Sequence, residues 1–189
     1  MEIKETNIPD LFVVEPRIFK DERGYFFESY NRKKLKKAGL NVNFVQDNES
    51  KSQEGVLRGL HFQKPPFGQG KLVRVIKGRV LDVAVDIRKG SPTYGRYHAV
   101  EISEENKKMF WIPEGFAHGF VTLEEDTIFF YKCTQYYNKE SEGSILWNDP
   151  DLCIDWKRKD PVLSEKDKNA PGFSIFDSPF VYPHSRDNQ

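Results

Sequence analysis

The side chains best suited to proton chemistry gather in one short stretch of the chain. Arg58, His61, Gln63 and Lys71 fall within fourteen residues, in two predicted strands separated by a proline- and glycine-rich loop. Histidine exchanges protons near neutral pH, whereas arginine and lysine supply positive charge for anions or for a developing oxyanion. Residues 55–95 therefore predict one wall of a pocket that moves protons on its ligand.

Two residues further along the chain could complete such a pocket. His118 lies in the run IPEGFAHGF, where it is either a turn histidine bonded to backbone or a pocket donor to a phosphate or sugar. Tyr131 lies within a predicted strand, where a buried core tyrosine is the common case. A general acid that faces a polar cavity is the alternative. The residues alone leave both questions open.

The position of His61 raises a question of geometry. A lone histidine in an apolar strand is usually a core residue, but here Arg58, Gln63 and Lys71 are close in sequence. Strict alternation along a strand places Arg58 and His61 on opposite faces. If both line one pocket, we expect a β-bulge near Gly59.

The histidines carry no sequence-local metal signature. The chain has 4 of them, and none forms an HxH or HxxxH pair. A metal site assembled in space from His61 and His118 would need a carboxylate as its third ligand, and the spacing does not indicate which one.

The composition favours an all-β fold. The 189 residues include 15 Phe and 8 Tyr, and 13 Gly and 11 Pro are spread along the chain as turns. Short apolar runs between frequent turns are typical of a sandwich or barrel. One helix is predicted at residues 31–39, capped by Asn31, and another begins at Ser164.

The strand pattern covers most of the chain. Residues 71–77 and 79–88 predict a hairpin that turns at Lys77 and Gly78. Within the second run, Leu81, Val83, Val85 and Ile87 share one face, which we expect to be core, and Asp82, Ala84 and Asp86 share the other. The remaining strands are expected at residues 11–19, 24–30, 44–50, 56–63, 97–102, 109–112, 116–123 and 127–134.

The charges exclude several classes of partner. Lys and Arg number 29 and Asp and Glu number 29, so neither nucleic acid nor a membrane surface is indicated. There is no apolar signal core and no run long enough to span a membrane. Cys133 and Cys153 lie in apolar surroundings and are expected to be buried thiols in the cytoplasm.

Eight runs of the chain resemble one enzyme family, in the same order. They read FKDERGYFFESY, QDNES, GVLRGLHFQ, KLVRVIKGRVLDVAVDIRKGSPTYG, SEENKKMFWIPEGFAHGF, YKCTQYY, WNDPDL and LSEKD. The family is that of the dTDP-4-dehydrorhamnose 3,5-epimerases, and the resemblance covers roughly residues 13–167. The joint occurrence of LRGLHFQ, KLVRV, SPTYG and GFAHGF makes it specific.

The resemblance implies a fold, a reaction and an assembly. The fold would be all-β, a single cupin-type jelly-roll barrel with a few short peripheral helices over residues 1–189, of which 184–189 form a polar tail. The reaction would convert dTDP-4-dehydro-6-deoxy-D-glucose to dTDP-4-dehydro-L-rhamnose, with no metal or organic cofactor. Gln63 stands where many metal-binding cupins carry a histidine. The assembly would be a homodimer with exchanged N-terminal strands.

The resemblance also implies roles for individual residues. His61 would be the base, Asp167 the carboxylate paired with it, Tyr131 the acid on the other face of the sugar, and Lys71 the cation near the C4 oxygen. Tyr137 would stack on thymine. The implied substrate contacts are Arg23, Glu28, Gln46, Asn48, Arg58, Lys71, His118, Tyr137, Glu142 and Lys166.

Three alternatives remain open at this point. A 3- or 5-epimerase of another dTDP-4-keto-deoxysugar could use the same base. A metal-dependent cupin and a non-enzymatic sugar-binding cupin are more distant. By themselves, Arg23 and Glu28 could be surface charges, and Asp167 could be a first-turn helix acid.

Overall fold

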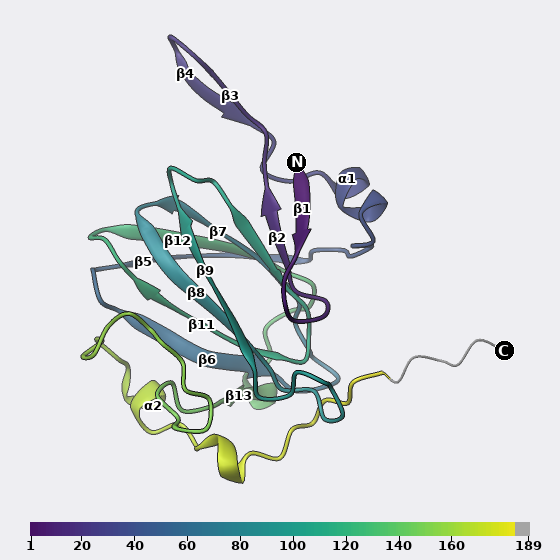
Figure 1. Ribbon diagram of the computed structural model, residues 1–189, viewed down its shortest axis with the longest axis vertical. Coiled ribbons are helices and arrows are strands. Elements are labelled where there is room, and N and C mark those ends of the chain that lie inside the picture. Colours follow the sequence, from purple (N-terminus) through teal and green to yellow (C-terminus); the bar gives the residue numbers. More distant parts are fainter. Residues whose placement is uncertain (184–189) are drawn as a thin grey trace, which may run out of the picture.

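Two antiparallel sheets face each other and form the body of the molecule (Figure 1). The structure, a computed structural model, describes residues 1–183, and the polar tail predicted at 184–189 lies outside them. The six-stranded sheet has the order β1-β2-β10-β7-β12-β5, and the five-stranded sheet has the order β13-β6-β11-β8-β9. Strands β3 and β4 form a separate hairpin that projects from the body.

All strands and helices of the described chain are short. The strands are β1 (Glu2–Glu5), β2 (Phe12–Glu15), β3 (Ile18–Asp21), β4 (Gly24–Phe27), β5 (Gln46–Ser52), β6 (Leu57–Gln63), β7 (Lys71–Lys77), β8 (Arg79–Asp86), β9 (Tyr97–Ser103), β10 (Met109–Ile112), β11 (Phe116–Thr122), β12 (Thr127–Cys133) and β13 (Glu142–Ser144). The helices are α1 (Arg32–Lys37) and α2 (Glu165–Lys168), with single 3₁₀ turns η1 (Lys139–Ser141) and η2 (Phe173–Ile175).

The predicted all-β class is confirmed, and the arrangement is that of a cupin-type jelly roll. The barrel core lies between the two sheets, because strands of both contribute to one apolar cluster. Its members include Val73, Val75, Phe110, Ile112 and Phe129 from the six-stranded sheet and Val80, Ala84, Ile102, Phe116 and Phe120 from the five-stranded sheet. Within residues 1–183, no helix is long and apolar enough to cross a membrane.

The hairpin predicted from β7 to β8 is wrong. Strand β7 pairs with β10 and β12, whereas β8 pairs with β9 and β11. Only Gly78 separates the two strands, which is too short for a two-residue hairpin turn. Gly78 has φ +79°, and a Cβ there would lie 2.4 Å from Oγ1 of Thr127. The glycine therefore marks a corner at which the chain passes from one sheet to the other.

Both faces of β8 are buried, and the face of Val83, Val85 and Ile87 lies in a hydrophobic core as expected. Val83, Val85 and Ile87 pack outside the barrel, against Trp156 and other residues of the C-terminal segment. The opposite face, which carries Asp82 and the core residue Ala84, is the one inside the barrel. Alternation identifies the two faces of a strand, but it does not show that a later segment covers the outer one.

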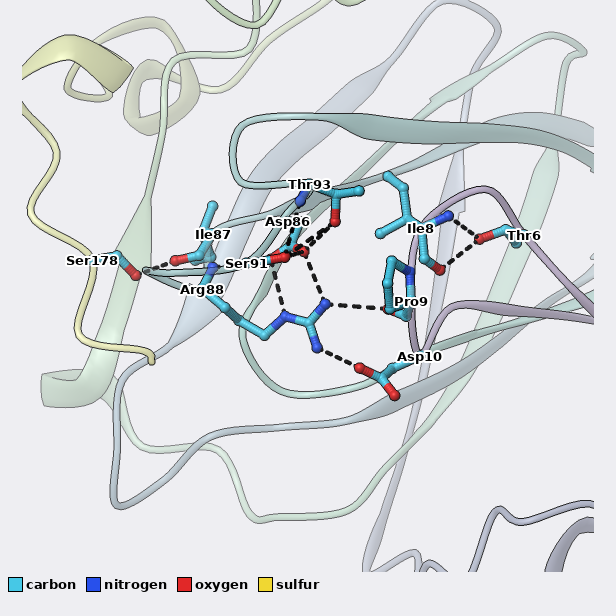
Figure 2. Close-up of polar contacts among 10 residues, drawn as sticks. All are labelled: Thr6, Ile8, Pro9, Asp10, Asp86, Ile87, Arg88, Ser91, Thr93 and Ser178. Atoms are coloured by element: carbon cyan, nitrogen blue, oxygen red, sulfur yellow. Dashed lines mark hydrogen bonds and ion pairs between the residues drawn. The ribbon is translucent and has the colours of Figure 1, made fainter. Parts of the chain in front are cut away.

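A buried ion pair fixes the N-terminal loop to one end of β8 (Figure 2). Arg88 is 7% exposed; its Nε donates to Oδ1 of Asp86 at 3.0 Å, and its Nη1 donates to Oδ2 of Asp10 at 2.6 Å. Ser91 and Thr93 donate further hydrogen bonds to Asp86. Every part of the Arg88 guanidinium is thereby held by this chain's own groups.

Both helix predictions are confirmed. Asn31 caps α1 by accepting a hydrogen bond from the backbone of Lys34, and the lysines of the helix are exposed while Leu35 is buried. Ser164 caps α2. Of the two thiols, Cys133 is buried as expected, but Cys153 is exposed, which corrects the prediction. Cys153 lies in a turn with φ +49°, where apolar neighbours in sequence do not enclose it.

Candidate active site

A cavity of about 430 Å³ opens between the two sheets, and its lining includes the four predicted catalytic residues together with Arg58 and His118. Its lining comprises Ser50, Val56, Leu57, Arg58, His61, Lys71, His118, Phe120, Phe129, Tyr131, Val162, Leu163, Ser164 and Asp167. A larger hollow of about 770 Å³ borders Arg88 and Trp111, but among residues 1–183 no histidine, lysine or tyrosine lines it. The smaller cavity is therefore the candidate active site.

His61 and Asp167 form a pair inside this cavity. Nε2 of His61 lies 2.5 Å from Oδ1 of Asp167, which is buried. Burial raises the pKa of the Asp167 carboxyl, but the hydrogen bond and charge of His61 outweigh it, so the pKa is lowered overall. Since an ionised carboxylate only accepts hydrogen bonds, Nε2 carries the hydrogen and Nδ1 remains free to take a proton.

The predicted bulge at Gly59 is present. The register of β6 on β11 shifts between the pairs His61–His118 and Arg58–Phe120. Gly59 has φ +146°, and a Cβ there would lie 2.5 Å from Cα of Gly119. The bulge therefore places Arg58 and His61 in the lining of the same cavity despite their spacing.

Lys71 and Tyr131 approach from the opposite sheet. They lie on the adjacent strands β7 and β12, with Nζ of Lys71 5.8 Å from the centre of the Tyr131 ring. Burial lowers the pKa of Lys71, against the opposing charges of Asp82 and Glu142. Burial also raises the pKa of Tyr131, so its phenol keeps its proton at neutral pH. The arrangement offers a proton donor beside a cation.

His118 lies within strand β11, and its partner is a carboxylate rather than backbone. Its Nε2 is 3.0 Å from both Oδ1 and Oδ2 of Asp82, and both residues are buried. Asp82 was expected on a polar face but without a role. The signal available in the sequence was an acidic residue in the middle of the apolar run VLDVAVD, since such a group is buried only with a partner.

Strand β5 contributes two of the predicted contacts beside the cavity. Asn48 lies opposite Tyr131 in the sheet register and donates to Sγ of Cys133 at 3.6 Å. Gln46 hydrogen-bonds to Asn48 at 3.1 Å and accepts from the backbone of Tyr137 at 2.9 Å.

Gln63 has a structural use of its own. Its amide donates to the carbonyls of Phe67, at 2.8 Å, and Tyr136, at 3.1 Å, and accepts from the backbone of Asn138 at 2.6 Å. The side chain thus joins two loops. Across residues 1–183, no three His, Cys, Asp or Glu side chains are grouped so as to hold a metal ion.

Three further predicted contacts, Tyr137, Glu142 and Lys166, form a separate group. Glu142 begins β13, Lys166 lies in α2, and Tyr137 lies in the loop between β12 and η1. Nζ of Lys166 lies 2.5 Å from Oε1 of Glu142, and the Tyr137 hydroxyl donates to Oε2 of Glu142 at 3.5 Å. None of the three is in the lining of the 430 Å³ cavity, but Glu142 is close enough to influence Lys71.

One chain does not bring Arg23 and Glu28 to the cavity. Arg23 lies on the projecting β3–β4 hairpin and pairs with Asp21 at 2.5 Å (Figure 1). Glu28 follows the hairpin and pairs with Lys34 at 2.7 Å. Neither residue lines the 430 Å³ cavity of its own chain.

Comparisons with known proteins identify the family of the chain. The family model described as dTDP-4-dehydrorhamnose 3,5-epimerase matches residues 5–174. The chain belongs to that family. It is 57% identical to a dTDP-4-dehydrorhamnose 3,5-epimerase of Salmonella typhimurium over 173 residues, which cover 90% of this chain and 94% of the relative.

Solved structures of this epimerase family have the same fold. A dTDP-6-deoxy-D-glucose-3,5-epimerase from Legionella pneumophila, in complex with dTDP-4-keto-L-rhamnose, is 50% identical with a TM-score of 0.92, covering 97% of this chain and 99% of that one. A 3'-monoepimerase from Streptomyces bikiniensis, in complex with dTDP-quinovose, is 34% identical with a TM-score of 0.85, covering 89% and 86%. The chain is thus an isomerase of the sugar-nucleotide epimerase class.

Proposed function

We propose that the chain converts dTDP-4-dehydro-6-deoxy-D-glucose to dTDP-4-dehydro-L-rhamnose in the cavity between the two sheets. The 4-keto group of this substrate acidifies the hydrogens on C3 and C5. Removing one of them gives an enolate, and returning a proton to the opposite face inverts that carbon. The His61–Asp167 pair, facing Lys71 and Tyr131, is the observation that carries the proposal.

His61 is the base in this scheme. Its Nδ1 takes the proton, while Asp167 holds the ring through Nε2 and stabilises the imidazolium that forms.

Tyr131 is the acid. His61 comes from β6 in one sheet and Tyr131 from β12 in the other, so the two side chains reach the cavity from opposing walls. A sugar ring held between them would lose a proton on one face and receive one on the other, as inversion requires.

Lys71 stabilises the enolate oxygen at C4. Its ammonium lies in a half-buried position where a positive charge acts strongly on a developing anion. A donor aimed at such an oxyanion is typically worth about 3 kcal/mol of barrier. No metal ion or organic cofactor takes part.

The remaining predicted residues bind the nucleotide and the sugar. Arg58 is exposed at the cavity and suits the diphosphate, since a guanidinium matches phosphate oxygens. Tyr137 is exposed and suits a stack on thymine. The other proposed contacts are Gln46, Asn48, His118, Glu142 and Lys166.

The working form is a homodimer. The β3–β4 hairpin exposes Phe19 (51%), Tyr25 (57%) and Phe26 (70%), which is a large apolar surface for so small an element. Strand β2 pairs with β1 and with β10 of its own chain, so the hairpin is the element that a partner would receive. It would carry Arg23 and Glu28 to the partner's cavity.

We also propose that residues 1–189 act as one domain in the cytoplasm. Two free cysteines, one of them exposed, suit a reducing compartment.

The test is solvent exchange with the 4-keto sugar nucleotide in D₂O, with a 4-keto reductase present to trap the product. We expect deuterium at both C3 and C5 by NMR. Label at C3 and never at C5 would favour the single-carbon alternative and overturn the 3,5 assignment.

A further inference from the structure

Asp82 is a buried carboxylate that the proposed reaction does not use. Its exposed fraction is 0%, and it points from β8 into the barrel toward His118. A carboxylate in such a place is strongly disfavoured unless a partner compensates for the lost water. Among the described side chains, its hydrogen-bond partner is the His118 ring alone, at 3.0 Å from each oxygen.

This contact fixes which ring nitrogen of His118 carries hydrogen. An ionised carboxylate accepts hydrogen bonds and donates none, so the nitrogen that faces it, Nε2, must be the N–H. Burial lowers the pKa of His118, and the charges of Lys71 and His61 lower it further against the effect of Asp82. The ring is therefore neutral near pH 7, and Nδ1 carries a lone pair.

The surroundings also fix the plane of the ring. His118 stacks on Phe129 with ring centres 6.2 Å apart and planes 26° apart, and Phe129 stacks in turn on Phe120 at 4.0 Å. All three side chains line the cavity. The imidazole is thus held by an aromatic stack along one side and by Asp82 at Nε2.

We propose that Asp82 is a positioning residue that sets the His118 tautomer, so that Nδ1 accepts a hydrogen bond from a sugar hydroxyl in the cavity. The sugar as ligand rests on the proposed function, whereas the tautomer rests only on the Asp82–His118 contact. His118 then differs from Arg58 and Lys71, which can only donate. The site would require a hydroxyl at the position that faces His118.

The tautomer can be read without substrate. In protein labelled with ¹⁵N-histidine, the signals of His118 are assigned by their loss in His118→Gln. At neutral pH we expect a hydrogen on Nε2 and none on Nδ1. A hydrogen on Nδ1, or on both nitrogens, overturns the proposal, whatever the substrate proves to be. This measurement uses the unmodified protein and so does not depend on the folding of an Asp82 variant.

The kinetic consequence is tested with Asp82→Asn. An amide can donate to Nε2 and so permits the reversed tautomer, in which Nδ1 carries the hydrogen. By analogy with other misoriented histidines, we expect kcat/KM to fall by roughly 100-fold or more, together with a change in the ¹⁵N pattern. Asp126→Asn, the same change at an exposed turn carboxylate, should leave kcat/KM unchanged.

A double variant separates positioning from general damage. If Asp82 acts through His118, Asp82→Asn should cost little more in the His118→Gln background, so the two losses do not multiply. Losses that multiply would overturn the proposal. If the unmodified protein fails to epimerise the dTDP-sugar but shows the expected tautomer, the proposed function fails and the Asp82–His118 assignment stands.

Discussion

His61 Nε2 lies 2.5 Å from Asp167 Oδ1, although the two residues are 106 positions apart in the chain. A short parallel bridge brings the later segment to the strand that carries His61. The backbone of Leu57 donates to Val162 at 2.9 Å, and that of Val162 donates to Gly55 at 2.8 Å. Asp167 follows within one turn of the capped helix α2, which lies beside β6 (Figure 1). The His61–Asp167 pair therefore depends on this parallel bridge as much as on either side chain.

Replacing His61 should abolish turnover and spare binding. We expect His61→Ala to lower kcat by at least about 10³-fold, because no other group at that position can take the proton. Binding of the dTDP-sugar, measured by calorimetry, should change little. His98→Ala, outside the cavity, is the matched control. Retained epimerisation in His61→Ala would falsify the assignment of the base.

Replacing Tyr131 should separate proton removal from proton return. In Tyr131→Phe, His61 can still form the enolate, so deuterium from solvent should enter recovered substrate while product formation falls. NMR of substrate and product in D₂O measures both. Tyr94→Phe, at a residue outside the cavity lining, is the control. Unchanged product formation would exclude Tyr131 as the acid.

Lys71 should determine the pH at which kcat falls on the alkaline side, the alkaline limb of the pH–rate profile. Because burial lowers its pKa, it loses its proton at a lower pH than a free lysine, and kcat should fall there. Lys71→Arg keeps the positive charge at high pH, so the pH at which kcat falls should rise, even if the maximal kcat is lower. The other titratable groups that act on Lys71 are Asp82, Cys133, Glu142 and Lys166.

Cys133 provides the control for that profile. It also titrates on the alkaline side, with a pKa that burial raises. If Lys71 sets the limb, Cys133→Ser should leave the limb close to its original position. A limb that moves with Cys133→Ser and stays in place with Lys71→Arg would contradict the assignment.

Two inactive variants should complement each other if the hairpin serves the partner's cavity. An Arg23→Ala chain still has its own His61, and a His61→Ala chain can still supply Arg23, so one site of each mixed dimer is complete. After random reassociation, about a quarter of wild-type activity should return, since half the dimers are mixed and each has one intact site. No gain on mixing would place Arg23 outside the partner's site.

The Arg88 ion pair should contribute strongly to stability. Arg88→Met leaves Asp86 buried without its cation, which typically costs about 3–5 kcal/mol. Urea unfolding measures the loss. Lys89→Met, which removes an exposed ion pair with Asp177, should change stability by less than about 1 kcal/mol. Equal losses in the two variants would contradict the structural role of the Arg88 network.

Local signals predicted the elements well, because their causes are local. Asn31 and Ser164 cap the helices in which the sequence placed them, and the bulge at Gly59 follows from the spacing of Arg58 and His61. The β7–β8 hairpin failed for a non-local reason. Whether the chain makes a hairpin turn or a corner at Gly78 depends on which strands pair with β7. Those strands are β10 and β12, and no residue near position 78 indicates that pairing.

The site was predictable in part for the same reason. The pairing of His61 with Asp167 came from the family resemblance, because no spacing rule joins residues so far apart. Asp82 was overlooked because its significance depends on complete burial against His118. Arg23 lies outside the cavity of its own chain, so one chain alone leaves its predicted contact untested.

The hydrogen bonds of Gln63 limit which side chains can stand at that position. Its amide makes three hydrogen bonds that join two loops. An imidazole has one donor and one acceptor when neutral and could not replace all three. Histidine at position 63 would therefore weaken the connection between the loop after β6 and the loop after β12.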